Sequence, residues 1–201
     1  MSIICDLSSV SNTYDIVYAD PPWLYYGDTN KDQAAGKHYA CMTVDKISAL
    51  PIRSIMSHRA CAFIWATSSK LEDAIRVINA WNLHYRGVFQ VWVKTNKAGK
   101  AISGQGVRPS YTKPTVEYLL VASTHAQGRT FPILTEAMEN VVMAPRPGNI
   151  HSKKPAVFRD NITKLLGDRS RIELFARESI EGWDAWGNEV QVPDVHLSDV
   201  V

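Results

Sequence analysis

The sequence has few cysteines, no long apolar run and almost no net charge. Its three cysteines, Cys5, Cys41 and Cys61, are widely spaced and form no C-x-x-C pair, which argues against a disulfide framework or a structural zinc site. No stretch approaches the roughly 18 consecutive apolar residues of a membrane-spanning helix, and the first residues do not read as a signal peptide. We therefore expect a soluble, cytoplasmic protein without a metal site or a membrane contact.

The formal net charge of +2 is too small to indicate a nucleic-acid-binding protein by composition. The distribution of charge is more informative, because residues 94–113 and 146–154 contain basic side chains and no acidic one. These basic residues are Lys94, Lys97, Lys100, Arg108 and Lys113 in the first segment, and Arg146, Lys153 and Lys154 in the second. Two such segments suit a phosphate backbone, but charge alone does not distinguish them from solvated loops.

Apolar runs alternate with helical patterns along the chain. Strand-like runs lie at Tyr14 to Ala19, Ala60 to Trp65, Gly87 to Val93, Val116 to Ala122, Asn140 to Met143 and Arg171 to Phe175. Helical patterns lie between them, at Val44 to Met56, Lys70 to Trp81 and Pro155 to Leu166. This order predicts an α/β fold with a mainly parallel central sheet and helices on both faces.

A chain of 201 residues with 45% hydrophobic content can bury one sizeable core. We expect a single domain over residues 1–190 and a flexible tail over 191–201. Three long segments, 23–38, 95–115 and 144–154, do not resemble strands or helices. Loops of this length in a compact domain are usually functional or disordered.

The most informative motif is Asp20-Pro21-Pro22-Trp23, directly after the apolar run YDIVYA. In a parallel α/β sheet this position lies at the carboxyl end of a strand, where ligands bind. The two prolines hold the turn rigid and leave carbonyl oxygens as acceptors. We expect the Asp20 carboxylate and the Pro21 carbonyl to accept the amine hydrogens of a flipped-out adenine while Trp23 stacks against the base.

Such a site can promote methylation without a metal or a covalent nucleophile. The lone pair of the adenine amine is delocalised into the ring, so hydrogen bonds that make this nitrogen more tetrahedral, and alignment with a methyl sulfonium, lower the barrier. An ordinary strand-to-loop turn that happens to contain two prolines is the alternative interpretation of the motif by itself.

At these residues the sequence resembles the adenine methyltransferases related to the catalytic subunit of the eukaryotic messenger-RNA N6-adenosine methyltransferase, in their small bacterial and bacteriophage form. Further segments match that family in its order over nearly the whole chain: Cys5-Asp6-Leu7, Tyr39 in KHYACMTVDKI, WVKTN at 92–96, EYLLV at 117–121, HSKKP at 151–155, RIELFAR at 171–177 and WGNE at 186–189. The resemblance implies a Rossmann-like methyltransferase fold with S-adenosylmethionine as cofactor.

The resemblance also assigns roles to residues. It places Asp20, Pro21, Pro22 and Trp23 in catalysis, and it assigns the cofactor to Asp6, Leu7, Asp20, Lys154, Glu173, Phe175, Arg177, Asn188 and Glu189. The substrate is assigned to Tyr39, Trp65, Lys94, Asn96 and Glu117. From the residues themselves, Glu117 needs a basic or amide partner because it lies in an apolar strand, Glu173 suits an anchoring role as well as a ligand role, and Lys94 also reads as an exposed charge at a strand end.

Two departures qualify the assignment. No G-x-G-x-x-G fingerprint occurs, which agrees with the family's permuted order, in which the catalytic motif precedes the cofactor strand. The P-H-N stretch that follows the family's E-L-F-x-R element in the eukaryotic enzyme is missing, and Glu189 stands where that enzyme has glutamine. No histidine contact is therefore transferred.

The sequence leaves the substrate open between DNA, which we favour, and RNA. A non-catalytic nucleic-acid-binding subunit and a methyltransferase for protein glutamine or for a small-molecule amine are further alternatives. A homodimer or a pairing with a paralogue is compatible with the chain. Failure to modify any adenine would revive the non-adenine alternatives.

Overall fold

The apolar runs build one seven-stranded sheet in the computed structural model, which describes residues 2–4, 6–10, 12–25, 41–103, 111–148, 153–188 and 190. The strands are β1 (Tyr14–Ala19), β2 (Met56–Ala66), β3 (His84–Thr95), β4 (Val116–Ser123), β5 (Val141–Pro145), β6 (Arg171–Leu174) and β7 (Asp184–Trp186). All six predicted runs form strands. The seventh, β7, was not predicted because it is three residues long and lies among polar residues.

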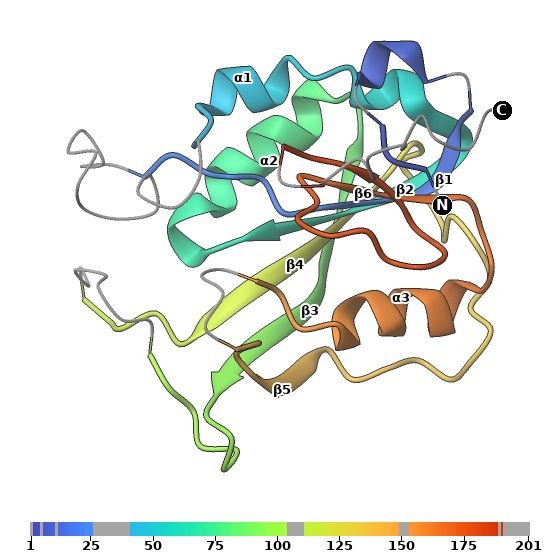
Figure 1. The fold of residues 1–201 in the computed structure, drawn as a ribbon. Coiled ribbons are helices and arrows are strands. Elements are labelled where there is room, and N and C mark those ends of the chain that lie inside the picture. Colours follow the sequence, from blue (N-terminus) through green and yellow to red (C-terminus); the bar gives the residue numbers. More distant parts are fainter. Residues whose placement is uncertain are drawn as a thin grey trace, which may run out of the picture.

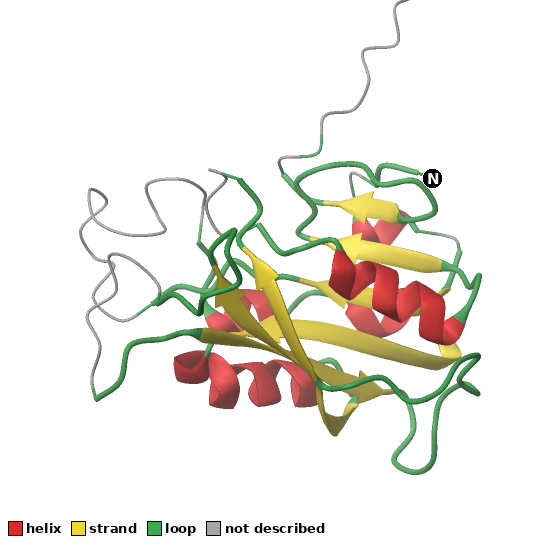
Figure 2. Ribbon diagram, turned by 90° about the horizontal axis from the view of Figure 1, so that it is seen from below, coloured by secondary structure: helices red, strands yellow, loops and turns green. Residues whose placement is uncertain are grey.

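The sheet is mostly parallel, which confirms the predicted α/β fold. Its order is β5-β3-β4-β2-β1-β6-β7, and β4 alone runs antiparallel to its two neighbours. The other neighbouring pairs are parallel. We call the edge at which the parallel strands end the carboxyl edge, and the opposite one the amino edge. Because β4 is reversed, its first residues also lie at the carboxyl edge. Figure 2 shows the twist of the sheet.

Helices cover both faces of the sheet. The helices α1 (Val44–Ser48) and α2 (Leu71–Ala80) lie on one face, and α3 (Val157–Leu166) lies on the other (Figure 1). Each helix buries an apolar stripe: α2 contributes Val77 and Ile78 to one core cluster, and α3 contributes Phe158 and Ile162 to the other. Burial of two separate apolar faces is what holds a sheet of this kind between layers.

The predicted helix from Val44 to Met56 is wrong in its second half. The helix α1 ends at Ser48, Ile52–Ile55 forms a 3-10 helix, and Met56 already belongs to β2. The cause is Pro51, which lacks an amide hydrogen and disfavours helical backbone in the residue before it. The helices α2 and α3 form where they were predicted, but α3 begins two residues after Pro155.

The chain start runs along the outer strand β7. Ile3 pairs with Ala185 in parallel, and the backbone N–H of Ile4 donates to the Ala185 carbonyl at 2.8 Å. Because this pairing is parallel, Asp6 follows at the carboxyl edge.

A tight backbone contact joins β6 to β7 at the same edge. Phe175 has a left-handed backbone conformation, with φ of 59°, which is uncommon for a residue other than glycine. The N–H of Ala176 donates to the Trp186 carbonyl at 2.9 Å. Gly187 lies so close that a Cβ there would be 2.6 Å from the Ala176 nitrogen. Residue 187 therefore has to be glycine.

We predict that Gly187→Ala destabilises the protein by about 1–3 kcal/mol, the usual cost of forcing atoms into a filled space. Urea denaturation measures the free energy of unfolding. Asn188→Ala is the matched control, since Asn188 is exposed, and it should change stability by less than about 0.5 kcal/mol. Equal stability of the two variants would contradict the close approach.

Candidate active site

The Asp-Pro-Pro-Trp motif forms a locked turn at the carboxyl end of β1. The Pro21 carbonyl accepts the Trp23 N–H at 2.8 Å, and the Pro22 carbonyl accepts the Met42 N–H at 2.8 Å. The carbonyls therefore serve the turn itself, which differs from the purely outward role expected from the sequence. A carbonyl oxygen has two lone pairs, so Pro21 retains one acceptor site for a ligand.

Trp23 does not present an open stacking face in this structure. Its side chain is 4% exposed, and its indole N–H donates to the Trp65 carbonyl at 3.0 Å. The stacking of Trp23 on a base stays a prediction, and the ring is buried in this conformation. Burial removes this large apolar ring from water, and its hydrogen bond to Trp65 fixes the position of the turn.

Lys154 lies at the centre of the site, between two carboxylates. Its Nζ is 2.7 Å from the Asp20 carboxylate and 3.4 Å from that of Glu117. The other oxygen of Glu117 lies 2.5 Å from the Nζ of Lys94. Four residues that the sequence singled out, from β1, β3, β4 and the segment before α3, are thus joined in one chain of charges. The predicted basic partner of Glu117 is confirmed.

Burial and the neighbouring charges shift the pKa values of these residues. Burial raises the pKa of Asp20 above its ordinary value, although Lys154 opposes this effect. Burial also pushes the pKa of Glu117 upward, but the two neighbouring lysines outweigh it and hold that pKa below its ordinary value. For Lys154, burial acts against the charged form, and the two carboxylates prevail and raise its pKa. Lys154 and Glu117 are therefore charged at neutral pH, whereas the pKa of Asp20 lies above that of an ordinary aspartate.

Aromatic rings form the floor beneath these lysines. The Nζ of Lys154 lies 5.4 Å from the centroid of the Trp65 ring, and that of Lys94 lies 5.4 Å from the Trp92 ring. Both positions suit a cation–π contact. Trp65 is 1% exposed, and its indole N–H donates to the Tyr18 hydroxyl at 2.6 Å. Trp65 supports the lysine from within the core, and its role as a substrate contact stays a prediction.

A hollow opens beside Asp20 at the carboxyl edge. It is lined by Asp20, Lys153, Lys154, Arg159, Glu173, Phe175, Arg177 and Glu178. Glu173 contacts Arg159 of α3 at 2.5 Å, so it anchors a helix. Burial raises the pKa of Glu173, and Arg159 opposes that shift. Lys153 pairs with Glu178 at 2.7 Å.

The sequence missed three of these lining residues: Lys153, Arg159 and Glu178. Lys153 and Glu178 adjoin the recognised residues Lys154 and Arg177, so proximity in sequence was the available signal. Arg159 gave a weaker one, since an arginine on the buried face of a helix needs a carboxylate partner.

The remaining predicted residues lie at the same edge or outside the described part of the chain. Asp6 accepts the Ser8 N–H at 2.9 Å, and this hydrogen-bonding lowers its pKa. Leu7 is 4% exposed and packs in the core, so its side chain is not a cofactor contact in this structure. Asn188 is exposed. Tyr39 and Glu189 lie outside the described residues.

Asn96 follows β3 and organises its own loop. Its side-chain oxygen accepts the N–H groups of Ala98 and Lys100 at 3.0 and 2.9 Å. The side chain is exposed at the carboxyl edge, but this oxygen is already engaged, which leaves the amide NH₂ as the group available to a substrate.

Comparison with known proteins agrees with this geometry. Residues 14–189 match the family described as MT-A70. The chain belongs to the MT-A70 family. The matched range includes the turn at Asp20, the lysine cluster and most of the hollow.

Several curated relatives are named as methyltransferases, and the name of one of them specifies RNA. The type II methyltransferase M.MunI of Mycoplasma sp is 28% identical over 90% of this chain and 78% of its own length. The N6-methyladenosine RNA methyltransferase MTA1 of Pyricularia oryzae is 29% identical over 92% of this chain, and the human N(6)-adenine-specific methyltransferase METTL4 is 26% identical over 94%. The chain spans less than half the length of these last two, 48% and 40%.

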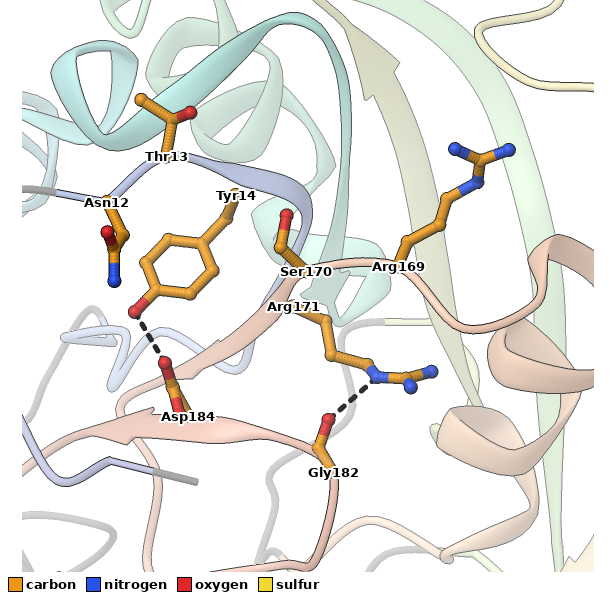
Figure 3. A pocket seen from close by; sticks show the side chains of 8 residues that line it. All are labelled: Asn12, Thr13, Tyr14, Arg169, Ser170, Arg171, Gly182 and Asp184. Atoms are coloured by element: carbon orange, nitrogen blue, oxygen red, sulfur yellow. Dashed lines mark hydrogen bonds between the residues drawn. The ribbon is translucent and has the colours of Figure 1, made fainter.

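A second hollow lies at the amino edge, at the opposite edge of the sheet from the Asp20 turn; Figure 3 shows its lining. Its lining includes Tyr14, Arg171 and Asp184, which are held by contacts of their own. The Tyr14 hydroxyl donates to Asp184 at 2.8 Å, and Arg171 donates to the Gly182 carbonyl at 2.7 Å. These groups tie β1, β6 and β7 together. Ligands of α/β sheets bind at the carboxyl edge, so the hollow beside Asp20 is the candidate active site.

Within the described ranges, the protein has neither a cluster of metal ligands nor a membrane-spanning helix. No group of three or more His, Cys, Asp or Glu side chains there could hold a metal ion. No helix in that part of the chain is long and apolar enough to cross a membrane.

We predict that Lys154→Met destabilises the protein by about 3–5 kcal/mol, because it leaves the Asp20 and Glu117 carboxylates buried without their shared counter-charge. Thermal and urea unfolding measure the effect. Arg76→Met is the control: Arg76 pairs with Asp73 at 3.7 Å but is 61% exposed, and such pairs contribute less than about 1 kcal/mol. Similar losses in the two variants would show that the lysine is not a structural centre.

Proposed function

We propose that the chain is an S-adenosylmethionine-dependent methyltransferase that modifies the N6 amine of adenine in DNA. Membership of the MT-A70 family supports methyl transfer to adenine. The preference for DNA rests on the likeness to a Caenorhabditis elegans protein named DNA N6-methyl methyltransferase, which is 24% identical over 88% of this chain and 45% of its own length. The target base is flipped out of the helix, because a stacked base cannot enter a site at the end of a strand.

One observation carries the proposal: a rigid turn presents a carboxylate and a carbonyl side by side next to a hollow of mixed charge. Asp20 accepts one hydrogen of the adenine amine, and Pro21, through its remaining lone pair, accepts the other. Both acceptors are held in place, Pro21 by the Trp23 N–H and Asp20 by Lys154. A fixed acceptor pair orients the amine lone pair and costs no reorganisation during the reaction.

The hollow fits the chemistry of the cofactor. S-adenosylmethionine supplies an electrophilic methyl group, and its amino-acid end carries an ammonium and a carboxylate. The carboxylates of Asp20 and Glu173 suit the cationic parts, and Lys153 and Arg177 suit the carboxylate. Phe175, in its left-handed conformation, contributes an aromatic wall whose ring packs on Trp186 at 5.4 Å between centroids.

These contacts change the role expected for Lys154. Its ammonium is matched by two carboxylates, so we assign it to the positioning of Asp20 and leave the cofactor carboxylate to Lys153 and Arg177. Asp6 and Asn188, both at the carboxyl edge, suit the hydroxyl and amine groups of the adenosine moiety.

RNA is the second candidate substrate, favoured by the likeness to MTA1, whose name specifies RNA. The proposed contacts of Asp20 and Pro21 are made to the base amine, which DNA and RNA share, so they do not distinguish a ribose from a deoxyribose. A methylation assay with matched sequences of DNA and RNA decides between the two substrates.

We predict that the wild-type protein converts deoxyadenosine in DNA to N6-methyldeoxyadenosine and that Asp20→Asn lowers the rate by at least about 100-fold, the usual effect of losing a transition-state contact. Nucleoside mass spectrometry of matched DNA and RNA measures the product. Calorimetric titration with the cofactor shows whether the variant still binds it. Methylation of RNA alone would show that RNA, and not DNA, is the substrate. Full activity of Asp20→Asn would refute the mechanism.

The raised pKa of Asp20 predicts the pH dependence of the reaction. Only the ionised carboxylate is a full acceptor, so kcat/KM should fall as the pH is lowered, and the fall should begin above the range of an ordinary aspartate. The negative charge of Glu117 contributes to the upward shift. Glu117→Gln should therefore move this acid limb to lower pH. A limb that stays in place or moves upward would contradict the electrostatic account.

A further inference from the structure

The amino edge of the sheet carries a surface that is basic throughout. Its residues come from segments 51–61, 82–88 and 123–130, which contain no aspartate or glutamate. We call this set the amino-edge basic surface; it comprises Arg53, Arg59, Arg86 and Arg129, together with His58 and His84. Neither the site at the carboxyl edge nor the sequence analysis made use of it.

Strand pairing brings the three segments together. Ser123, at the end of β4, pairs with Cys61 of β2 on one side and with His84 of β3 on the other. The next residue continues the junction, since the Thr124 N–H donates to the Ala60 carbonyl at 3.0 Å, and its hydroxyl donates to the His58 carbonyl at 2.8 Å. The surface is therefore built on the ends of three neighbouring strands.

Three of the arginines are held by backbone carbonyls without losing their charge. Arg53 donates to the carbonyl of Met56 at 3.2 Å. Arg59 donates to the carbonyls of Arg129 and Thr130 at 3.3 and 3.1 Å. Arg86 donates to the carbonyl of Gly128 at 3.0 Å and also to that of Ala126. Carbonyl oxygens are neutral, so they hold each guanidinium in place and leave its positive charge uncompensated. Ordering of the side chain before binding reduces the entropic cost of a later contact.

The lack of ion pairs separates these four arginines from four arginines elsewhere in the protein. Arg76, Arg159, Arg169 and Arg171 each pair with a carboxylate. Among the residues that the structure describes, the four arginines of the amino-edge basic surface have no carboxylate partner within 4.0 Å. Unpaired arginines that cluster on one face attract an anion, and the guanidinium group is well suited to phosphate.

We propose that the amino-edge basic surface binds the phosphate backbone of the nucleic acid at a distance from the target base. This inference rests on the proposed function, because it takes the polymer to be the substrate. Arg86 and Lys94 stand at opposite ends of β3, which places the two edges about 25 Å apart at the usual rise of a strand. That distance corresponds to about seven or eight nucleotides along one strand of a duplex. The polymer follows the side of the sheet from one edge to the other.

The proposal predicts a dependence on polymer length that a local substrate contact does not give. An oligonucleotide of about eight nucleotides centred on the target reaches the catalytic edge alone, whereas one of about 30 reaches both edges. Arg53→Gln/Arg129→Gln removes two charges and leaves Arg59 and Arg86 to hold the loop. The expected result is a roughly three- to tenfold weaker Kd for the long oligonucleotide and a salt slope that is smaller by about one to two.

The short oligonucleotide supplies the internal control. Its Kd and its kcat should be the same for the double variant and the wild type. Arg76→Gln/Lys164→Gln removes two charges elsewhere, from α2 and α3, and controls for net charge. If this control weakens binding of the long oligonucleotide as much as the double variant does, or if neither weakens it, the proposed surface is refuted.

The outcomes separate the surface from the proposed function. A wild-type protein that methylates DNA but whose double variant binds the long oligonucleotide unchanged would refute the surface and leave the function standing. A wild-type protein without methylation whose binding still depends on Arg53 and Arg129 would refute the function and support the surface. Polyglutamate that competes with the long oligonucleotide at equal charge concentration would indicate an acidic protein as the partner and overturn the assignment to nucleic acid.

Discussion

The ion triad formed by Asp20, Lys154 and Glu117 is the interaction on which the site depends. A buried charge is costly unless it is paired and hydrogen-bonded. Here one ammonium serves two carboxylates that come from different strands, β1 and β4. Lys94 balances the second carboxylate from the far side, at 2.5 Å. Removing Lys154 leaves Asp20 without its lysine partner, so the strands, the loop before α3 and the catalytic turn hold one another in place.

The triad also separates the titration of its two acids. Glu117 has two lysine neighbours, and its pKa lies below the ordinary value, whereas the pKa of Asp20 is raised by burial. The acid whose pKa is raised is the one that follows β1, next to the hollow, where the adenine amine has to be received. Perturbed groups of this kind gather at functional sites because a reaction needs them. The aromatic floor of Trp65 and Trp92 keeps water away from the lysines and strengthens these interactions.

The sequence allowed much of this arrangement to be predicted. Uninterrupted apolar runs such as YDIVYA specify buried strands, and the Asp-Pro-Pro-Trp turn follows one of them, so the catalytic edge could be foreseen. A glutamate in the apolar run at 116–122 required a basic partner, although the sequence did not say that the partners would be Lys94 and Lys154. Pairing between distant segments depends on the register of the strands, which no local pattern contains.

The rest of the arrangement depends on tertiary packing. The rings of Trp23 and Trp65 are buried in the core, where their N–H groups find acceptors, and no local pattern indicated these partners. Pro51 cut short a helix whose apolar spacing was otherwise suitable. Glu173 was not expected to pair with Arg159, because residues on a strand and a helix meet only after the layers have packed.

In this account the carboxyl edge of the sheet performs the methyl transfer, and the amino edge attracts the phosphate backbone of the nucleic acid. The central claim is that the hollow beside Asp20 receives the cofactor while Lys154 stays between its two carboxylates. A crystal structure of the wild-type protein with S-adenosylmethionine tests it most directly. The account predicts the cofactor against Phe175 and Arg177, with its methyl group facing the Asp20 turn. A cofactor bound at the hollow around Tyr14 and Asp184, or a Lys154 that has left both carboxylates, would contradict it.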